Sequence, residues 1–196
     1  MPRRNRQQSP TGIYHWIVRG IHKKTLFHHT KDYLHFKSLL KIHKEDHQIQ
    51  IYHYCLMSNH VHLLIHSPSI EEMAKFSQII QRRYAYYYCG AYKWVGSVFQ
   101  PGYRSLVVDR EDYLLECGRY IERNPVRAKL CKHPSEYAYS SFGYYGCASE
   151  DELVDTSPVY LGMADSDNAR LAIYNDYVTE IRVQEEMMTE ATRCLV

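Results

Sequence analysis

The chain has 196 residues, 45% of them hydrophobic, which is enough to bury the core of one domain. It contains no apolar run long enough to cross a membrane. Its first residues are basic and polar and lack the hydrophobic segment of a secretory signal, so we expect a cytoplasmic protein. Six cysteines lie far apart without a Cys-x-x-Cys pair, which argues against a zinc ribbon or a redox motif.

The net charge of +2 is unevenly distributed along the chain. Residues 149–196 contain 11 Asp and Glu against three Arg, a net charge of −8, which leaves +10 on residues 1–148. A body of that charge favours a polyanion such as nucleic acid as its partner. We expect residues 1–148 to form the functional domain, with a basic arm over 1–12. Residues 149–196 are expected to be an acidic C-terminal extension that tempers nucleic-acid binding.

Hydrophobic periodicity and turn residues predict seven elements. In chain order they are a strand at 13–20, a helix at 31–47, strands at 48–57 and 60–66, a helix at 69–90, a strand at 103–108 and a helix at 109–123. Ser69 and Glu72 predict a capping box, Asp109 a helix cap, and Pro125 a non-helical Asn124. The order predicts an α+β protein with a ferredoxin-like βαββαβ antiparallel sheet, two helices on one face and the additional helix on the other.

The predicted strand at 60–66 carries two histidines one residue apart. Because side chains alternate along a strand, His60 and His62 share a face with Leu64 and His66. The opposite face is apolar and carries Val61, Leu63 and Ile65. The Cα atoms of the two histidines are about 6 to 7 Å apart in such a strand, so both imidazoles can reach one ion. Paired histidines on a strand are also common as ordinary polar positions, so a metal site needs a third ligand.

The last predicted helix offers that ligand. Tyr120 and Asn124 are four residues apart and therefore lie on one face. Two imidazoles and an amide oxygen with open positions suit Mg²⁺ or Mn²⁺ better than a closed zinc site. Arg119, Arg123 and Arg127 follow at the same spacing, one position behind, and could hold phosphates or form a solvated face.

Four stretches, "YHWIVRG", "MSNHVHLLI", "YIERNPVRA" and "YAYSSFGYY", occur in the order and spacing of a known family. Over residues 13 to about 145 the chain resembles the REP-associated tyrosine transposases, which are HUH single-tyrosine transposases of the insertion-sequence type. The resemblance implies that Tyr120 is the catalytic nucleophile and that His60, His62 and Asn124 bind the metal. We expect DNA to be bound by five arginines: Arg19, Arg104, Arg119, Arg123 and Arg127.

The implied activity is Mg²⁺- or Mn²⁺-dependent cleavage and rejoining of single-stranded DNA near hairpin-forming, REP-like sequences, through a 5′-phosphotyrosine intermediate. The protein would be a monomer or homodimer. The main alternative is a non-catalytic domain of the same sheet plan that binds single-stranded nucleic acid, although its aromatic residues should lie on the central strands. A His-rich metal-binding or regulatory protein is a third possibility. Tyr113, seven residues before Tyr120, leaves a two-tyrosine replication initiator open.

Overall fold

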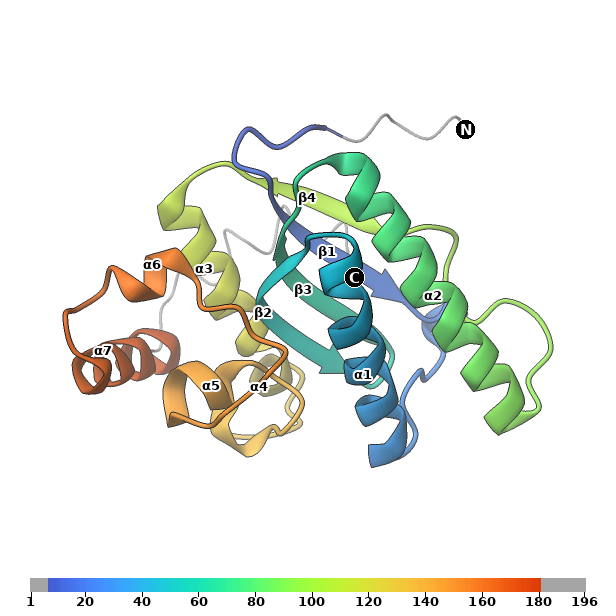
Figure 1. Ribbon diagram of the computed structural model, residues 1–196. Coiled ribbons are helices and arrows are strands. Elements are labelled where there is room, and N and C mark those ends of the chain that lie inside the picture. Colours follow the sequence, from blue (N-terminus) through green and yellow to red (C-terminus); the bar gives the residue numbers. More distant parts are fainter. Residues whose placement is uncertain (1–6, 181–196) are drawn as a thin grey trace.

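The computed structural model describes residues 7–180 (Figure 1). Its strands are β1 (Ile13–Arg19), β2 (Gln50–Met57), β3 (His60–His66) and β4 (Arg104–Val108). Its α-helices are α1 (Thr30–Asp46), α2 (Ile70–Tyr92), α3 (Glu111–Glu122), α4 (Asn124–Arg127), α5 (Phe142–Cys147), α6 (Pro158–Leu161) and α7 (Asp167–Thr179), with 3₁₀ turns at Ile21–Lys23 and Pro134–Glu136. Within this range no helix combines the length and apolar character of a membrane span.

The four strands form one antiparallel sheet in the order β2-β3-β1-β4. This confirms the predicted α+β fold with its βαββαβ plan, and β3 is a central strand as expected. Helices α1 and α2 lie side by side on one face of the sheet (Figure 1). Helix α3 packs against β2 and β3 on the other face.

The two faces of β3 bury different partners, as the alternation predicted. Val61 and Leu63 belong to the large core that the sheet forms with α1 and α2. Leu64, on the opposite face, packs with Cys117 and Ile121 of α3. The histidines share the face of Leu64 and therefore lie under the helix that carries Tyr120.

Two predictions about residues at helix ends are wrong. Arg110, not Asp109, stands at the N-cap of α3. Asn124 is helical, since it is the first residue of α4, which follows α3 after Arg123 alone. Pro125 is compatible with this because it falls in the first turn of α4, where proline is tolerated. Of the predicted capping box, the Ser69 half is present, since its hydroxyl accepts the amide hydrogen of Glu72 at 3.1 Å. The carboxylate of Glu72 pairs with His47 and Lys75 instead. Asn124 thus stays one turn beyond Tyr120.

The acidic segment after residue 148 packs on the body of the protein as far as residue 180. Three lysines along α1 pair with its carboxylates: Lys37 with Asp151, Lys41 with Glu152, and Lys44 with Asp155. A buried cluster joins both sides of the predicted boundary, with Phe142 and Tyr145 on one side and Tyr174 and Val178 on the other. Part of the negative charge therefore neutralises α1, and truncation at residue 148 would expose core.

Candidate functional site

One face of the sheet gathers the polar side chains of three strands. In the antiparallel register Arg19 of β1 pairs with His60, and Ile17 pairs with both His62 and Arg104. Directly paired residues point to the same face. His60, His62, Arg19 and Arg104 therefore share the face that α3 covers, and these are two of the five arginines predicted to bind DNA.

His15 is part of this group although the sequence analysis did not single it out. It lies on β1 two residues before Ile17 and so on the same face. Its Nε2 atom is 2.8 Å from Nδ1 of His62, and it is fully buried. Its other ring nitrogen is buried without a partner among the described residues. The one indication in the sequence was the alternation of side chains along the first strand, which places His15 on the same face as Ile17 and Arg19. That alternation points to His62 only once β1 is known to pair with β3.

His60 is oriented by its neighbour in the turn. Its Nδ1 atom lies 2.6 Å from Oδ1 of Asn59, whose amide nitrogen donates to the carbonyl of Lys23 at 3.3 Å. Because the Asn59 oxygen can only accept, Nδ1 of His60 carries the hydrogen and Nε2 keeps its lone pair. That lone pair is the atom a metal ion would use.

Three imidazoles of this face, those of His15, His60 and His62, are held neutral. Burial lowers the pKa of His15 to about 3, and burial followed by the charge of Arg19 lowers the pKa of His60 to about 4. Burial also sets the pKa of His62 well below its usual value, with further lowering by the two other imidazoles, Arg19 and Arg127. A neutral imidazole is the form that binds a metal ion.

Tyr120 lies directly over the histidines. Its ring centroid is 6.0 Å from those of His15 and His62, and both ring pairs meet edge to face. The guanidinium carbon of Arg127 sits 4.7 Å from the Tyr120 ring centre, a cation–π arrangement. The structure thus brings Tyr120 close to His15, His62 and Arg127.

Asn124, the third metal ligand that the sequence predicted, lies one helical turn beyond Tyr120. Its amide nitrogen donates to the carbonyls of Tyr120 and Ile121 at 2.9 and 3.3 Å. The amide oxygen has no hydrogen-bond partner among the described residues. Two neutral imidazoles and an amide oxygen fit a divalent ion that keeps open positions. Residues 7–180 contain no group of three His, Cys, Asp or Glu side chains that could hold a metal without such an amide.

Arg119 and Arg123 do not lie where the sequence analysis expected. Both are buried, and both donate to carbonyls at the end of α7: Arg119 Nε to Tyr177 at 3.0 Å, and Arg123 Nη1 to Val178 at 2.8 Å. These contacts contradict a solvated face and leave neither guanidinium open to DNA. Arg119 and Arg123 lie on a different face of the helix from Tyr120, and this face packs against the C-terminal segment. Helical spacing alone could not predict where that segment lies.

The helix that carries Tyr120 is anchored from its far side by Glu122. This carboxylate is fully buried and accepts three hydrogen bonds, from His53 Nδ1 at 3.0 Å, Ser141 Oγ at 2.6 Å and Tyr174 Oη at 2.7 Å. Gly118 permits the close approach, because a Cβ atom there would lie 2.9 Å from Nε2 of His53. The network ties α3 to β2, to the start of α5 and to α7.

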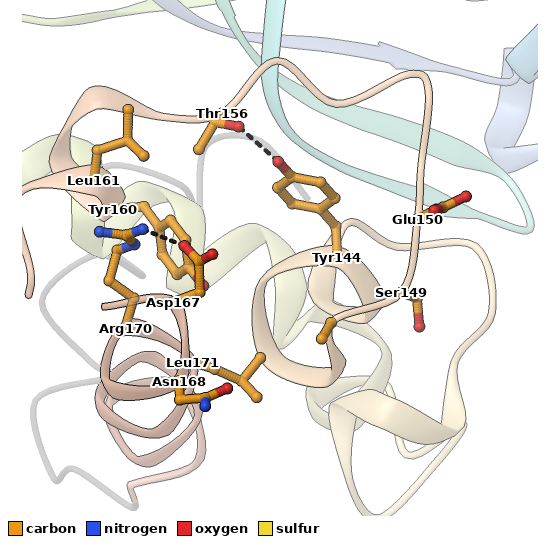
Figure 2. A pocket seen from close by; sticks show the side chains of 11 residues that line it. Tyr144, Ser149, Glu150, Thr156, Tyr160, Leu161, Asp167, Asn168, Arg170 and Leu171 are labelled. Carbon is orange, nitrogen blue, oxygen red and sulfur yellow. Dashed lines mark hydrogen bonds and ion pairs between the residues drawn. The ribbon is translucent and has the colours of Figure 1, made fainter. Parts of the chain in front are cut away.

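Two further features lie apart from the histidines. Tyr113 lines a hollow near the start of α3 together with Asp109, Arg110 and Tyr177. A cavity of about 370 Å³ lies between α5, α6 and α7. Its lining includes a hydrogen bond between the hydroxyls of Tyr144 and Thr156 and the ion pair of Arg170 with Asp167 (Figure 2). Among residues 7–180, all those that line this cavity come from the segment 144–171, so it belongs to the C-terminal part of the fold.

A family model described as "Transposase IS200 like" matches residues 9–124, a range that contains the histidine pair, Tyr120 and Asn124. The chain belongs to the IS200-like transposase family. Membership makes it a DNA-binding protein of DNA transposition. None of the curated proteins matches the chain.

Two solved structures resemble this transposase to different extents. A structure described as the REP-associated tyrosine transposase bound to a REP hairpin has a TM-score of 0.65 and 16% sequence identity, and covers 80% of this chain and 93% of its own. A transposase from Deinococcus radiodurans R1, described as putative, has a TM-score of 0.41 and 18% identity, covering 63% of this chain and 95% of its own. The first likeness supports the fold that the sequence predicted.

Proposed function

We propose that this transposase cleaves and rejoins single-stranded DNA next to hairpin-forming, REP-like sequences, through a 5′-phosphotyrosine intermediate on Tyr120. The observation that carries the proposal is the position of Tyr120, with its ring 6.0 Å from the rings of His15 and His62 on a face lined with cations. The solved relative is bound to a REP hairpin, and hairpin DNA is the substrate we infer for this chain.

In the proposed step the hydroxyl of Tyr120 attacks the phosphorus atom of one phosphodiester. The bond from phosphorus to the 3′ oxygen breaks, and the fragment downstream of the cut stays joined to Tyr120 through its 5′ phosphate. The upstream fragment leaves with a 3′-hydroxyl, to which the phenol proton passes in net. Attack by a 3′-hydroxyl on the phosphotyrosine reverses the step and rejoins DNA. No nucleotide cofactor is needed, because the tyrosyl ester keeps the bond energy.

We propose that His60, His62 and Asn124 hold one Mg²⁺ or Mn²⁺ ion. Such an ion would polarise and align the scissile phosphate. His15 acts as a positioning residue, since a hydrogen bond from Nδ1 of His62 to its Nε2 leaves the other nitrogen of His62 free to bind metal. Asn59 does the same for His60.

Three of the five predicted DNA-binding arginines support this site: Arg19, Arg104 and Arg127. Arg19 lies opposite His60, and Arg127 lies over the ring of Tyr120. Their positive charge would hold the strand across the sheet face and neutralise the phosphate during attack.

Incubation with a hairpin oligonucleotide and Mn²⁺, followed by denaturing electrophoresis, tests the function. A label on the 3′ end of the DNA should move with the protein, while a label on the 5′ end should appear in a shorter free product. Tyr120→Phe should bind DNA but form no adduct at any Mn²⁺ concentration, whereas Tyr113→Phe should still form it. His60→Ala should need more Mn²⁺ than the parent protein.

Two results would overturn the proposal. An adduct formed by Tyr120→Phe would place the nucleophile elsewhere, with Tyr113 the next residue to test. DNA binding without an adduct at any metal concentration would favour the non-catalytic nucleic-acid-binding domain. Tyr120→Phe and His60→Ala protein can also be mixed at an Mn²⁺ concentration at which neither forms adduct alone. Adduct restored in the mixture would show that one site takes residues from two chains.

A further inference from the structure

A tryptophan stands exposed at the corner of the molecule where α2 ends. Trp94 is 37% exposed and lies in the loop that follows Lys93, the left-handed C-cap of α2. Its backbone amide donates to the carbonyl of Cys89 at 3.2 Å, and its indole nitrogen donates to the carbonyl of Ser97 at 3.2 Å. The loop therefore holds the ring in place without burying it. Tryptophan is highly buried on average, so an exposed ring that is fixed in position indicates a contact site.

Lys24 covers one face of this ring. Its Nζ atom lies 3.5 Å from the ring centre of Trp94 and 5.8 Å from that of Tyr88 on α2. Such a cation–π contact fixes the plane of the indole and brings a positive charge beside it. With one face occupied by the ammonium group, the other face of the indole is the one on which a flat ring could stack.

The frame that carries these two side chains is tied together by hydrogen bonds. The amide of Ile21 donates to the carbonyl of Val98 at 2.9 Å, which joins the turn after β1 to the loop before β4. The hydroxyl of Tyr84 donates to the carbonyl of Leu26 at 2.7 Å, which joins the same turn to α2. A ring on a rigid frame loses little entropy when a ligand binds to it.

This corner lies at the end of the sheet that carries the proposed metal site. Arg19, the last residue of β1, pairs with His60, and the amide of Gly20 donates to the carbonyl of Asn59 at 2.9 Å. The amide of Gln100 donates to the carbonyl of Arg19 at 2.8 Å. The loop that carries Trp94 is thus held at the end of β1, the strand next to His60.

The two segments that meet at this corner are basic. Residues 1–31 contain seven Lys and Arg and residues 73–108 contain five, and neither segment contains Asp or Glu. Asp32 follows the first segment, but its carboxylate is buried and accepts hydrogen bonds from the hydroxyls of Tyr87 and Tyr92 at 2.6 Å. A surface built from these segments attracts a polyanion.

We propose that Trp94 stacks on an unpaired base of the bound DNA strand, on the indole face opposite Lys24. The inference rests on the proposed function for the identity of the ligand as single-stranded DNA. A base fits this site because its flat π-face matches the fixed indole, while the neighbouring lysines attract the phosphates that flank the base. A paired base inside a hairpin stem is already stacked on its neighbours, so the site selects the single-stranded part of the substrate.

Tryptophan fluorescence tests the contact directly, because the chain has two tryptophans. Trp16 is fully buried in the core, so a stacked base can quench only Trp94. In a Tyr120→Phe background with EDTA, which prevents cleavage, an oligonucleotide with a hairpin and unpaired flanks should quench the emission as it binds. Trp94→Leu protein should lose this DNA-dependent quenching. Unchanged emission of the parent protein at saturating DNA would overturn the proposal.

Affinity is measured in the same background by fluorescence anisotropy of a labelled oligonucleotide. Trp94→Leu should weaken binding about 5- to 150-fold, the range for losing one stacked base, and Trp94→Phe should recover part of this loss. The slope of log affinity against log salt should stay the same, because stacking releases no counterion. Val95→Ala is the matched control, since Val95 is 90% exposed in the same loop, and it should bind like the parent protein.

Abasic substitutions along the unpaired flanks of the oligonucleotide then locate the base. One position should weaken parent binding and abolish the quenching, and should cause little further loss in Trp94→Leu protein. Parent affinity in Trp94→Leu protein, or losses that multiply at every abasic position, would overturn the proposal. If the stacking effects appear while the wild-type protein never forms an adduct, the proposed function fails and the stacking site stands.

Discussion

The Nε2 atom of His15 lies 2.8 Å from Nδ1 of His62. One proposed metal ligand is thus supported by a residue that is far away in sequence but lies on the neighbouring strand β1. His15 is fully buried and also touches the ring of Tyr120. A ligand imidazole usually gives its second ring nitrogen to such a partner, and the partner sets which nitrogen faces the metal.

Replacement of His15 should therefore weaken metal binding. We expect His15→Phe to raise the dissociation constant for Mn²⁺ by about 10- to 100-fold in calorimetric titration, because Nδ1 of His62 loses its acceptor. DNA binding in EDTA should not change. His15→Gln, which can still offer an acceptor oxygen, should recover part of the affinity. An unchanged Mn²⁺ dissociation constant in folded His15→Phe protein would contradict the positioning role.

Stability should fall in mildly acidic solution because of the buried histidines. The pKa of His15 is about 3 in the folded protein and near 6.5 once unfolded, so the unfolded chain binds more protons between these values. The free energy of unfolding of metal-free protein should drop as the pH falls from 6.5 to about 3, by up to about 1.4 kcal/mol per pH unit for each such histidine. Urea unfolding in EDTA at several pH values measures the slope.

His15→Gln is the control for this pH dependence. It removes one titrating group while the carboxylates stay the same, so its slope between pH 4 and 6 should be shallower than that of the parent protein. Parallel curves for the two proteins would show that His15 is not held neutral by burial.

Arg119 and Arg123 should matter for the stability of the fold, whereas Arg127, a few residues further along the chain, should matter for DNA binding. Alanine at either position leaves buried carbonyls of α7 without a donor, which should lower the free energy of unfolding by about 1 to 3 kcal/mol in urea. Arg127→Ala should cost less than about 0.5 kcal/mol and should weaken DNA binding. Loss of DNA affinity at full stability in Arg119→Ala would restore the phosphate role that the sequence suggested.

Glu122 should be among the most sensitive positions in the fold. Glu122→Ala removes the acceptor of three buried donors, and we expect a loss of about 3 kcal/mol or more. Tyr174→Phe removes one of these bonds and should cost about 1 kcal/mol. Equal losses in the two variants, measured by urea unfolding, would mean that Tyr174 alone carries the network.

The sequence by itself determined the features that depend on local geometry. The alternation of a strand placed His60 and His62 on one face, and the period of a helix placed Tyr120 one turn before Asn124. The order of the elements predicted the βαββαβ sheet with β3 at its centre. These relationships hold within a few residues of chain and need no knowledge of distant partners.

Only the tertiary structure decided which residues of other strands and helices these elements contact. The pairing of β1 with β3 brings His15 to His62, and the pairing of β1 with β4 sets Arg104 beside Arg19. The packing of α7 on α3 turned Arg119 from an expected DNA contact into a buried anchor. The physical reason is that register and packing join residues far apart in sequence, which hydrophobic periodicity does not encode.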